Sequence, residues 1–133
     1  MTEYLFVYGT LQPGQAPEEI AAIVDKLRPV GTGFIKGVLY DFGDFPAAVL
    51  DPSSKQTIHG TVFELSNDPK VLKRLDEYEE FDPVASDKSL FVRVPCKVKM
   101  TDGRALNSWV YAYNRRLDSA PVLESGRFEK KAV

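Results

Sequence analysis

Short runs of strand-forming residues, separated by turn signals, recur along this chain of 133 residues and constrain its fold more than any other feature. The clearest pair is an alternating run at 90–100 (LFVRVPCKVKM), then TDGR, then an aromatic run at 105–113 (ALNSWVYAY). This pattern predicts a β-hairpin. Further strands are predicted at 4–8, 33–40, 47–50 and 58–65. About six or seven short strands, joined mainly by hairpins and with few helices, predict an α+β fold built on a mixed or closed sheet.

Two other segments have the spacing of amphipathic helices. The first opens at Pro17, a residue that suits the first helical turn, and is expected to end at Pro29. The second has Asp68 as its N-cap and Pro69 as its first helical residue. The apolar stripes are Ile20, Ile23, Val24 and Leu27 in the first helix and Val71, Leu72, Leu75 and Tyr78 in the second. Each helix is therefore expected to bury one face.

The composition is ordinary for a globular protein. Hydrophobic residues make up 44% of the chain, charged residues make up 27%, and the net charge is −2. This charge gives no reason to expect nucleic acid or an anionic membrane as a partner. No apolar run approaches the ~18 residues of a membrane helix, and the N-terminus lacks the regions of a signal peptide. We therefore expect a single cytoplasmic domain over residues 1–133, with a polar, weakly patterned tail from about residue 115.

Cysteine and histidine are too scarce for several kinds of site. The chain has one of each, Cys96 and His59. It can therefore form no internal disulfide framework, and a dedicated transition-metal site is not expected. We assign His59 no role and expect Cys96 to pack in the core.

The run at 90–100 also predicts which side chains face the core. Its even-numbered residues are all apolar and are predicted to point inward. Phe91, Arg93, Lys97 and Lys99 are predicted to point the other way. The alternatives for Arg93 are pairing with a substrate carboxylate and pairing with the acidic end of the second helix, and the helix end is the expected partner.

The second helix ends in a group of acids, although the helix dipole favours cations there. The group is Asp76, Glu77, Glu79, Glu80 and Asp82. Crowding raises the pKa of at least one of these carboxyls, more so where that carboxyl is desolvated, and a raised pKa suits a general base near neutral pH. Glu79 follows Leu75 by four residues and so borders the buried stripe. Asp76 also lies near this stripe, whereas Glu77 and Glu80 lie further round the helix. Because acidic patches on helices are commonly just solvated surface, the charge pattern alone leaves both interpretations open.

The strand at 4–8 stops abruptly at Gly9, and a loop with few large side chains follows it. Such loops occur in tight turns, where glycine permits unusual backbone angles. They also occur where a ligand lies against main-chain amides. These residues alone leave the two alternatives open.

Two of these stretches, taken together, resemble the γ-glutamylcyclotransferase-like family. VYGTLQPG, at 7–14, is similar to the family's tyrosine–glycine–serine/threonine–leucine loop. LDEYEEFDP, at 75–83, is similar to its leucine–aspartate–any–aromatic–glutamate segment. The strands between and after these motifs also resemble the family's strands, so the similarity covers about residues 3–114. The order and spacing of the motifs make the match more specific than either motif alone.

The resemblance implies a small mixed β-barrel of about six or seven strands flanked by two main helices. It also implies an enzyme that cleaves a small γ-glutamyl amine or peptide by internal attack, releasing 5-oxoproline and a free amine without any metal or organic cofactor. The family's catalytic glutamate, which is general base and acid, corresponds to Glu79. The substrate-binding loop corresponds to Tyr8, Gly9, Thr10 and Leu11, whose main-chain N–H groups are expected to face the ligand.

Two residues depart from the family's pattern. Glu80 stands where the family usually has a glycine, which could supply a positive φ that glutamate tolerates poorly. Phe91 stands where many members have a tyrosine, so a phenol that could hydrogen-bond the substrate is missing. Two other functions remain compatible with the sequence. One is a binding module that holds a small acidic metabolite without turnover, and the other is an amide hydrolase that uses water.

Overall fold

The computed structural model describes residues 3–9, 18–24, 27–43, 45–65, 69–117 and 120–128. The elements are β1 (Tyr4–Val7), α1 (Glu18–Val24), β2 (Arg28–Asp41), β3 (Pro46–Leu50), β4 (Thr57–Glu64), α2 (Pro69–Tyr78), a 3-10 helix (Ser86–Lys88), β5 (Phe91–Met100) and β6 (Ala105–Tyr113). The predicted strands and helices are confirmed, although Pro17 and the predicted N-cap Asp68 lie outside the described residues. Within the described part of the chain, no helix has the length and apolar character needed to cross a membrane.

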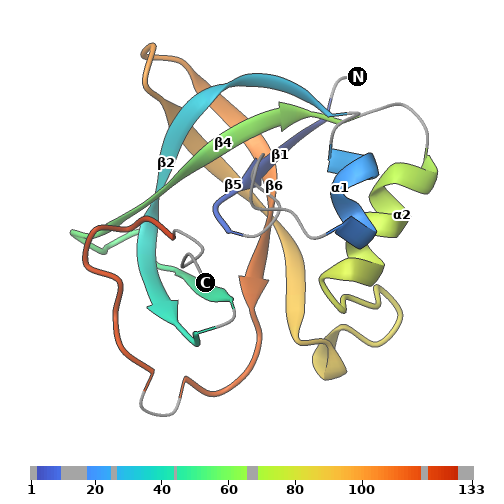
Figure 1. Ribbon diagram of the computed structural model, residues 1–133. Coiled ribbons are helices and arrows are strands. Elements are labelled where there is room, and N and C mark those ends of the chain that lie inside the picture. Colours follow the sequence, from blue (N-terminus) through green and yellow to red (C-terminus); the bar gives the residue numbers. More distant parts are fainter. Residues whose placement is uncertain are drawn as a thin grey trace.

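Five strands close into a small barrel, and β3 extends one edge of it (Figure 1). The strand order is β3-β2-β4-β1-β6-β5, and β2 also pairs with β5 through Gly33↔Met100 and Phe34↔Lys99, which closes the barrel. β1 runs parallel to β6, whereas the other neighbouring strands are antiparallel. The expected small mixed barrel with two flanking helices is therefore confirmed.

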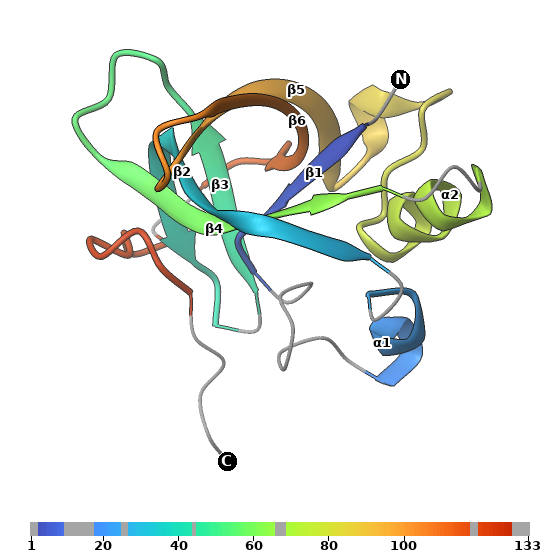
Figure 2. The ribbon, with the colours of Figure 1, turned by 90° about the horizontal axis from the view of Figure 1, so that it is seen from above.

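Apolar side chains form two clusters, one on each face of the barrel wall. The inner cluster draws on all six strands and includes Phe6 and Tyr8. The outer cluster includes Leu5 and Val7, and the helices α1 and α2 pack side by side over it (Figure 2). β1 is consequently buried on both faces, as its uninterrupted apolar run predicts.

The predicted facing of Phe91 in β5 is right, but the expectation that this face lies away from the core is wrong at that end of the strand. Val98 and Met100 point into the barrel as expected. Phe91, predicted to face away from the core, is buried in the outer cluster, where its ring meets the rings of Phe45 and Tyr113. The prediction fails because the outer face of this barrel is covered at that end, so alternation does not separate buried from exposed side chains.

β2 starts earlier than its sequence suggests. The strand predicted from residue 33 begins at Arg28, whose partner in β4 is Glu64. Pro29 was expected to end the first helix, but it lies inside β2, paired with Phe63 next to an irregularity in the register. Proline is tolerated at such irregular positions of a sheet, and this explains why its usual meaning as a helix end misled the prediction.

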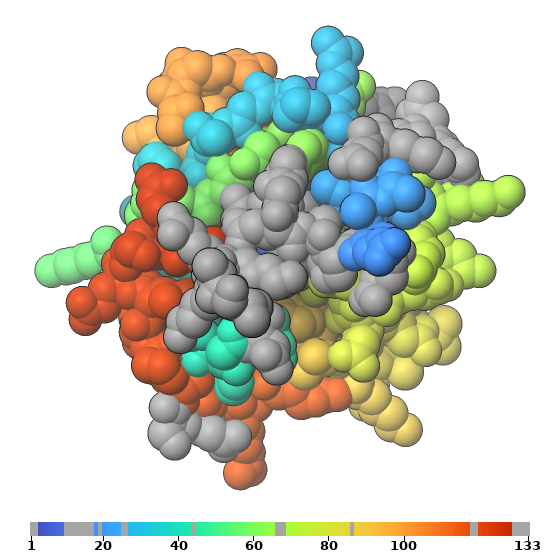
Figure 3. Space-filling model, viewed as in Figure 1, coloured from blue at the N-terminus to red at the C-terminus, as the bar shows by residue number. Residues whose placement is uncertain are grey.

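The chain after β6 contributes to the core, although its sequence predicts a weakly patterned tail. Val122 forms a bridge with Tyr40 of β2, and the N–H of Leu123 donates to the carbonyl of Leu39 at 2.7 Å. Phe128 then inserts into the inner cluster and is 7% exposed. Figure 3 shows this segment in red, on the side of the molecule away from the helices.

Candidate active site

A cavity of about 270 Å³ lies where the end of β1 meets the end of α2. The start of β3, the start of β5 and the side chain of Tyr111 in β6 complete its wall. The ionisable side chains in this wall are Tyr8, Tyr78, Glu79, Glu80 and Tyr111, and the other lining residues are apolar or glycine. The cavity lining is therefore mainly apolar, and it includes a group of polar side chains around the end of α2.

The way α2 ends brings Glu79 into this wall. The N–H of Phe81 donates to the carbonyl of Asp76 at 2.8 Å, and the N–H of Glu80 donates to that of Glu77 at 3.1 Å. These two bonds form a Schellman motif, which needs a left-handed backbone at its C′ residue, Glu80. Glu80 has a φ of 55°. The expectation that this position requires a positive φ is therefore confirmed, and the chain meets the requirement with a glutamate.

The carboxyl of Glu79 is held in a poorly hydrated place. Burial raises its pKa, and the neighbouring charge of Glu80 raises it further, to about 8. Both effects act in the same direction because each disfavours the ionised carboxylate. The crowded end of α2 therefore contains the raised carboxyl pKa that the sequence predicts. A group with this pKa can both accept and release a proton near neutral pH.

Two tyrosines, Tyr8 and Tyr111, line the same cavity as Glu79. Tyr8 donates its hydroxyl hydrogen to the main-chain carbonyl of Tyr111. The pKa of Tyr8 is raised first by burial and then by the charge of Glu79. Tyr111 has a pKa raised by burial, by its bond to Asp76, and by the charges of Asp76 and Glu79. Glu79 therefore acts electrostatically on both tyrosines, and all three residues line the same cavity.

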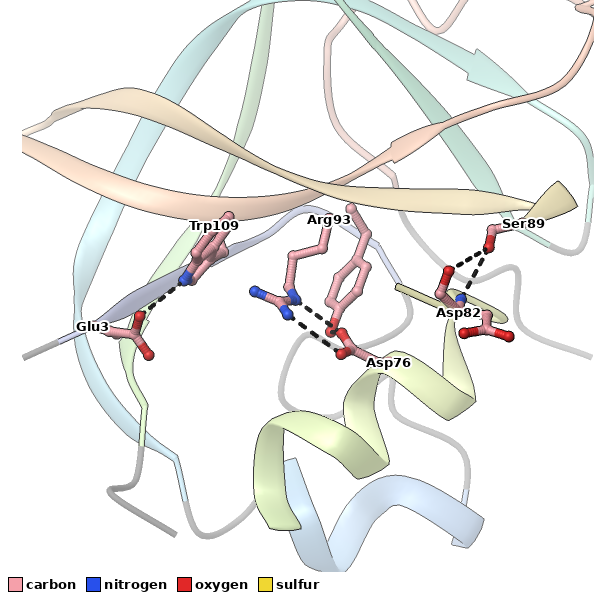
Figure 4. A network of polar contacts seen from close by, with 7 residues as sticks. Glu3, Asp76, Asp82, Ser89, Arg93 and Trp109 are labelled. Atoms are coloured by element: carbon pink, nitrogen blue, oxygen red, sulfur yellow. Dashed lines mark hydrogen bonds and ion pairs between the residues drawn. The ribbon is translucent and has the colours of Figure 1, made fainter. Parts of the chain in front are cut away.

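A partly buried ion pair supports Tyr111 from the side of α2. Asp76 is 7% exposed and receives Arg93 Nε at 2.9 Å on Oδ1 and a second guanidinium nitrogen at 3.4 Å on Oδ2. The Tyr111 hydroxyl donates to the same Oδ1 at 2.6 Å. The guanidinium also lies 4.5 Å from the centre of the Trp109 ring, and Figure 4 shows these side chains between the sheet and α2. The expected pairing of Arg93 with the acidic helix end is confirmed.

Hydrogen bonds also fix the segment that leads from α2 back to β5. The N–H of Asp82 donates to Ser89 Oγ at 2.9 Å (Figure 4). Asn114 Nδ2 donates to the Ser89 carbonyl at 3.0 Å. The N–H of Leu90 donates to the carbonyl of Glu80 at 3.3 Å. These bonds hold Leu90 and the start of β5 against the cavity.

The structure places three of the five predicted site residues around one cavity. Tyr8, Gly9 and Glu79 all line it, whereas Thr10 and Leu11 lie outside the described residues. Gly9 does not have a positive φ. A Cβ atom at Gly9 would lie 2.7 Å from Cγ of Pro46, which is too close for any side chain. Close packing on β3, rather than an unusual backbone angle, therefore explains this glycine.

The sequence indicated the aromatic wall of the cavity only faintly. Phe45 and Phe91 line it, and both rings contact Tyr113 behind them. Tyr111 alternates with other aromatic residues along its strand, a pattern that ordinary packing also produces. Tyr111 is distinguished from the other aromatic residues of β6 by the hydrogen bond from its hydroxyl to Asp76. A sequence pattern does not predict such a long-range bond.

Within the described ranges, no group of three or more His, Cys, Asp or Glu side chains is placed to hold a metal ion. The one cysteine, Cys96, lies among the residues packed against the inner cluster. Burial raises its thiol pKa to about 11. The chemistry that this site can support is therefore proton transfer by Glu79, next to two phenols and in a largely apolar cavity.

The fold is that of a class of enzymes, the γ-glutamyl cyclotransferases, as comparison with known proteins shows. Residues 5–130 match the family described as gamma-glutamyl cyclotransferase, AIG2-like, and the chain belongs to this family. It is 35% identical over 112 residues to the gamma-L-glutamyl-butirosin B gamma-glutamyl cyclotransferase of Niallia circulans, which covers 84% of this chain and 67% of that enzyme.

Solved structures show the same fold at lower identity. An AIG2-like protein from Mus musculus superimposes with a TM-score of 0.75 at 19% identity, over 96% of this chain and 88% of that one. YkqA from Bacillus subtilis gives a TM-score of 0.72 at 21% identity, over 96% of this chain. The chain spans only 40% of the length of YkqA. At these identities the likeness concerns the fold alone.

Proposed function

We propose that the protein cleaves a γ-glutamyl amine or peptide by intramolecular cyclisation, releasing 5-oxoproline and a free amine, with Glu79 as general base and acid. The observation that carries this proposal is the position of Glu79, whose carboxyl has a pKa of about 8 and lines one cavity with Tyr8 and Gly9. Family membership and the butirosin-modifying relative support the reaction class. We also propose a cytoplasmic location, which the composition supports.

The substrate's α-amine is an ammonium ion at neutral pH and cannot attack until it loses a proton. In the proposed mechanism the Glu79 carboxylate takes that proton. The freed nitrogen attacks the γ-carbonyl carbon and closes a five-membered ring. Glu79 returns the proton to the departing nitrogen as its bond to carbon breaks. After the attack the ring nitrogen still carries one hydrogen too many, and Glu79 transfers that proton to the released amine as well. The amine therefore leaves as an ammonium ion, and no water is consumed.

The apolar cavity supports this reaction in two ways. First, it confines a flexible γ-glutamyl chain so that the amine and the carbonyl meet. In well-oriented cases such positioning lowers the activation barrier by about 7–11 kcal/mol. Second, its mainly apolar lining offers few groups that would hold a competing water beside the internal amine. We propose that main-chain N–H groups at Gly9, Thr10 and Leu11 stabilise the carbonyl oxygen as it gains charge.

The test of this proposal is a panel of γ-glutamyl amines and peptides, assayed for 5-oxoproline and for the released amine. The proposal predicts equal amounts of both products from at least one member. The same compound with its α-amine acetylated should give neither product, because the nucleophile is blocked. Release of amine together with glutamate, rather than 5-oxoproline, would show a hydrolase and overturn the cyclisation. Binding of these compounds without any product would show a binding module.

A further inference from the structure

The hydroxyl of Tyr111 has a fixed direction, because of what Asp76 can and cannot do. Asp76 forms an ion pair with Arg93, with Nε to Oδ1 at 2.9 Å, and is 7% exposed. An ionised carboxylate accepts hydrogen bonds and has none to give. In the 2.6 Å contact between Tyr111 and Asp76 Oδ1, the hydrogen therefore belongs to the tyrosine.

A phenol has a single hydrogen to donate. Since Tyr111 gives its hydrogen to Asp76, its oxygen can only accept a further hydrogen bond. The same holds for Tyr8, whose hydroxyl donates to the main-chain carbonyl of Tyr111 and whose oxygen already accepts one hydrogen bond from the main chain of Ala48, so that one lone pair remains for a ligand. Both residues line the cavity, and the charge of Glu79 acts on both hydroxyls. The polar side of the cavity thus presents two neutral oxygen acceptors beside one carboxyl.

We propose that Tyr111, together with Tyr8, receives the α-ammonium group of the substrate, and that Asp76 and Arg93 are positioning residues that keep Tyr111 an acceptor. This inference rests on the proposed function. An ammonium has three N–H donors, which match the two phenol oxygens and the Glu79 carboxylate. Phenol oxygens are far weaker bases than a carboxylate, so they hold the ammonium without taking its proton. The proton then moves to Glu79, and the nitrogen is left facing the γ-carbonyl.

The test compares a γ-glutamyl amide substrate with the matching glutaryl amide, which lacks only the α-amino group and acts as a competitive inhibitor. Tyr111→Phe should raise KM for the substrate about tenfold or more, since a hydrogen bond to a charged group is lost. It should leave the inhibition constant of the glutaryl amide unchanged. Tyr113→Phe, the matched control in the same strand, should change neither constant. Equal weakening of both ligands in Tyr111→Phe would overturn the proposal.

Asp76→Asn tests the positioning role separately. Arg93 Nε and the Tyr111 hydroxyl donate to the same Oδ1, and the neutral amide oxygen of an asparagine accepts both bonds more weakly than a carboxylate. The phenol hydrogen is then free to point into the cavity, so KM should rise as in Tyr111→Phe. The double variant should be no worse than Tyr111→Phe alone, because both changes remove the same acceptor. Additive effects in folded variants, checked by thermal unfolding, would show that Asp76 does not act through Tyr111. If Tyr111→Phe does not fold, Asp76→Asn still tests the proposal. The proposal requires this variant to raise KM for the γ-glutamyl amide and to leave the inhibition constant of the glutaryl amide unchanged.

Calorimetric binding of the same two amides separates this inference from the proposed reaction. A protein that binds the γ-glutamyl amide more tightly than the glutaryl amide, and loses this preference in Tyr111→Phe, supports the ammonium site even if no 5-oxoproline forms. A protein that releases 5-oxoproline but keeps the preference in Tyr111→Phe contradicts the ammonium site alone. Absence of any preference in the unmodified protein would also overturn it.

Discussion

At the scale of single residues, Glu80 combines a structural cost with an electrostatic effect. It occupies the left-handed position that ends α2, with a φ of 55°, where a side chain with a Cβ is disfavoured by about 1–2 kcal/mol. Its charge is also one of the two causes that raise the pKa of Glu79. One residue therefore affects both the stability of the helix end and the proton affinity of the proposed base.

Glu80→Gly should stabilise the protein. The substitution relieves the left-handed conformation, and the free energy of unfolding should rise by about 1 kcal/mol after allowance for the freer unfolded chain. Chemical denaturation measures this change. The matched control is Glu77→Gly, at an exposed position of α2, which should destabilise by about 1 kcal/mol. Loss of stability in both variants would contradict the Schellman ending of this helix.

Glu80→Gln should move the pH dependence of activity. Removing the charge beside Glu79 removes one cause of the raised pKa, so the pKa of Glu79 falls below about 8. The rising limb of kcat/KM against pH should therefore shift to lower pH in the variant. A limb that stays in place would show that Glu80 does not act on the ionisation that limits the rate.

Glu79 should make the protein less stable as the pH rises. Its pKa is about 8 in the folded chain against an ordinary value of 4.5, so between these values the folded state holds a proton that the unfolded state has released. The free energy of unfolding then falls by about 1.4 kcal/mol per pH unit over that window. Below about pH 4.5 both states hold the proton, so this loss of unfolding free energy is absent.

Glu79→Gln carries no such penalty. It should match the unmodified protein near pH 4 and exceed it in stability by a growing margin up to about pH 8. Denaturation curves across this range measure the margin. A difference between the two proteins that does not change with pH would mean that the Glu79 carboxyl is not desolvated. A gain in stability on loss of the proposed base would fit the general conflict between active sites and stability.

At the scale of elements, local patterns predict most of the fold, because strands and helices reflect the periodicity of their own residues. The hairpin of β5 and β6 and the helix α2 follow from alternation, turn residues and apolar spacing. Contacts made at long range are different. Burial of Phe91 depends on an outer cluster assembled from other elements, and the early start of β2 depends on its pairing with β4. Neither effect has a local signal.

In the candidate site, too, some features have a local sequence signal and others depend on contacts at long range. The acids after Leu75 and the glycine after Tyr8 mark Glu79 and Gly9 as unusual within their own segments. The role of Gly9 as a packing partner of Pro46, and the bond between Tyr111 and Asp76 across 35 residues of sequence, depend on how separate elements meet. Sequence patterns can therefore identify candidate residues, but they cannot supply the contacts that define their roles.

The segment after β6 is the element that the sequence predicts least well, and it offers a direct test. Phe128 fills part of the inner cluster and is 7% exposed. Phe128→Ala should therefore destabilise the protein by about 3–5 kcal/mol. Val84→Ala is a suitable control because Val84 is 95% exposed, and it should change stability little. Chemical denaturation that finds Phe128→Ala as stable as the control would show that the segment does not complete the barrel core.

At the scale of the whole molecule, the barrel brings together groups that are far apart in the sequence. β1 supplies the end of a strand buried on both faces, α2 supplies the carboxyl, and β5 and β6 supply the aromatic wall and the ion-paired support. Because these elements are fixed by pairing and packing, the described part of the cavity wall is formed without a ligand. Such preorganisation favours a reaction in which positioning of the substrate's own amine provides much of the rate.

The most direct test of the account is the release of 5-oxoproline by the unmodified protein, by Glu79→Gln and by the control Glu77→Gln, using the best γ-glutamyl compound of the panel. The account predicts that Glu79→Gln folds and binds the compound but forms 5-oxoproline at least about 100-fold more slowly, as expected on loss of a general acid–base group. Glu77→Gln should react at the unmodified rate. Normal 5-oxoproline release by Glu79→Gln would contradict the central claim.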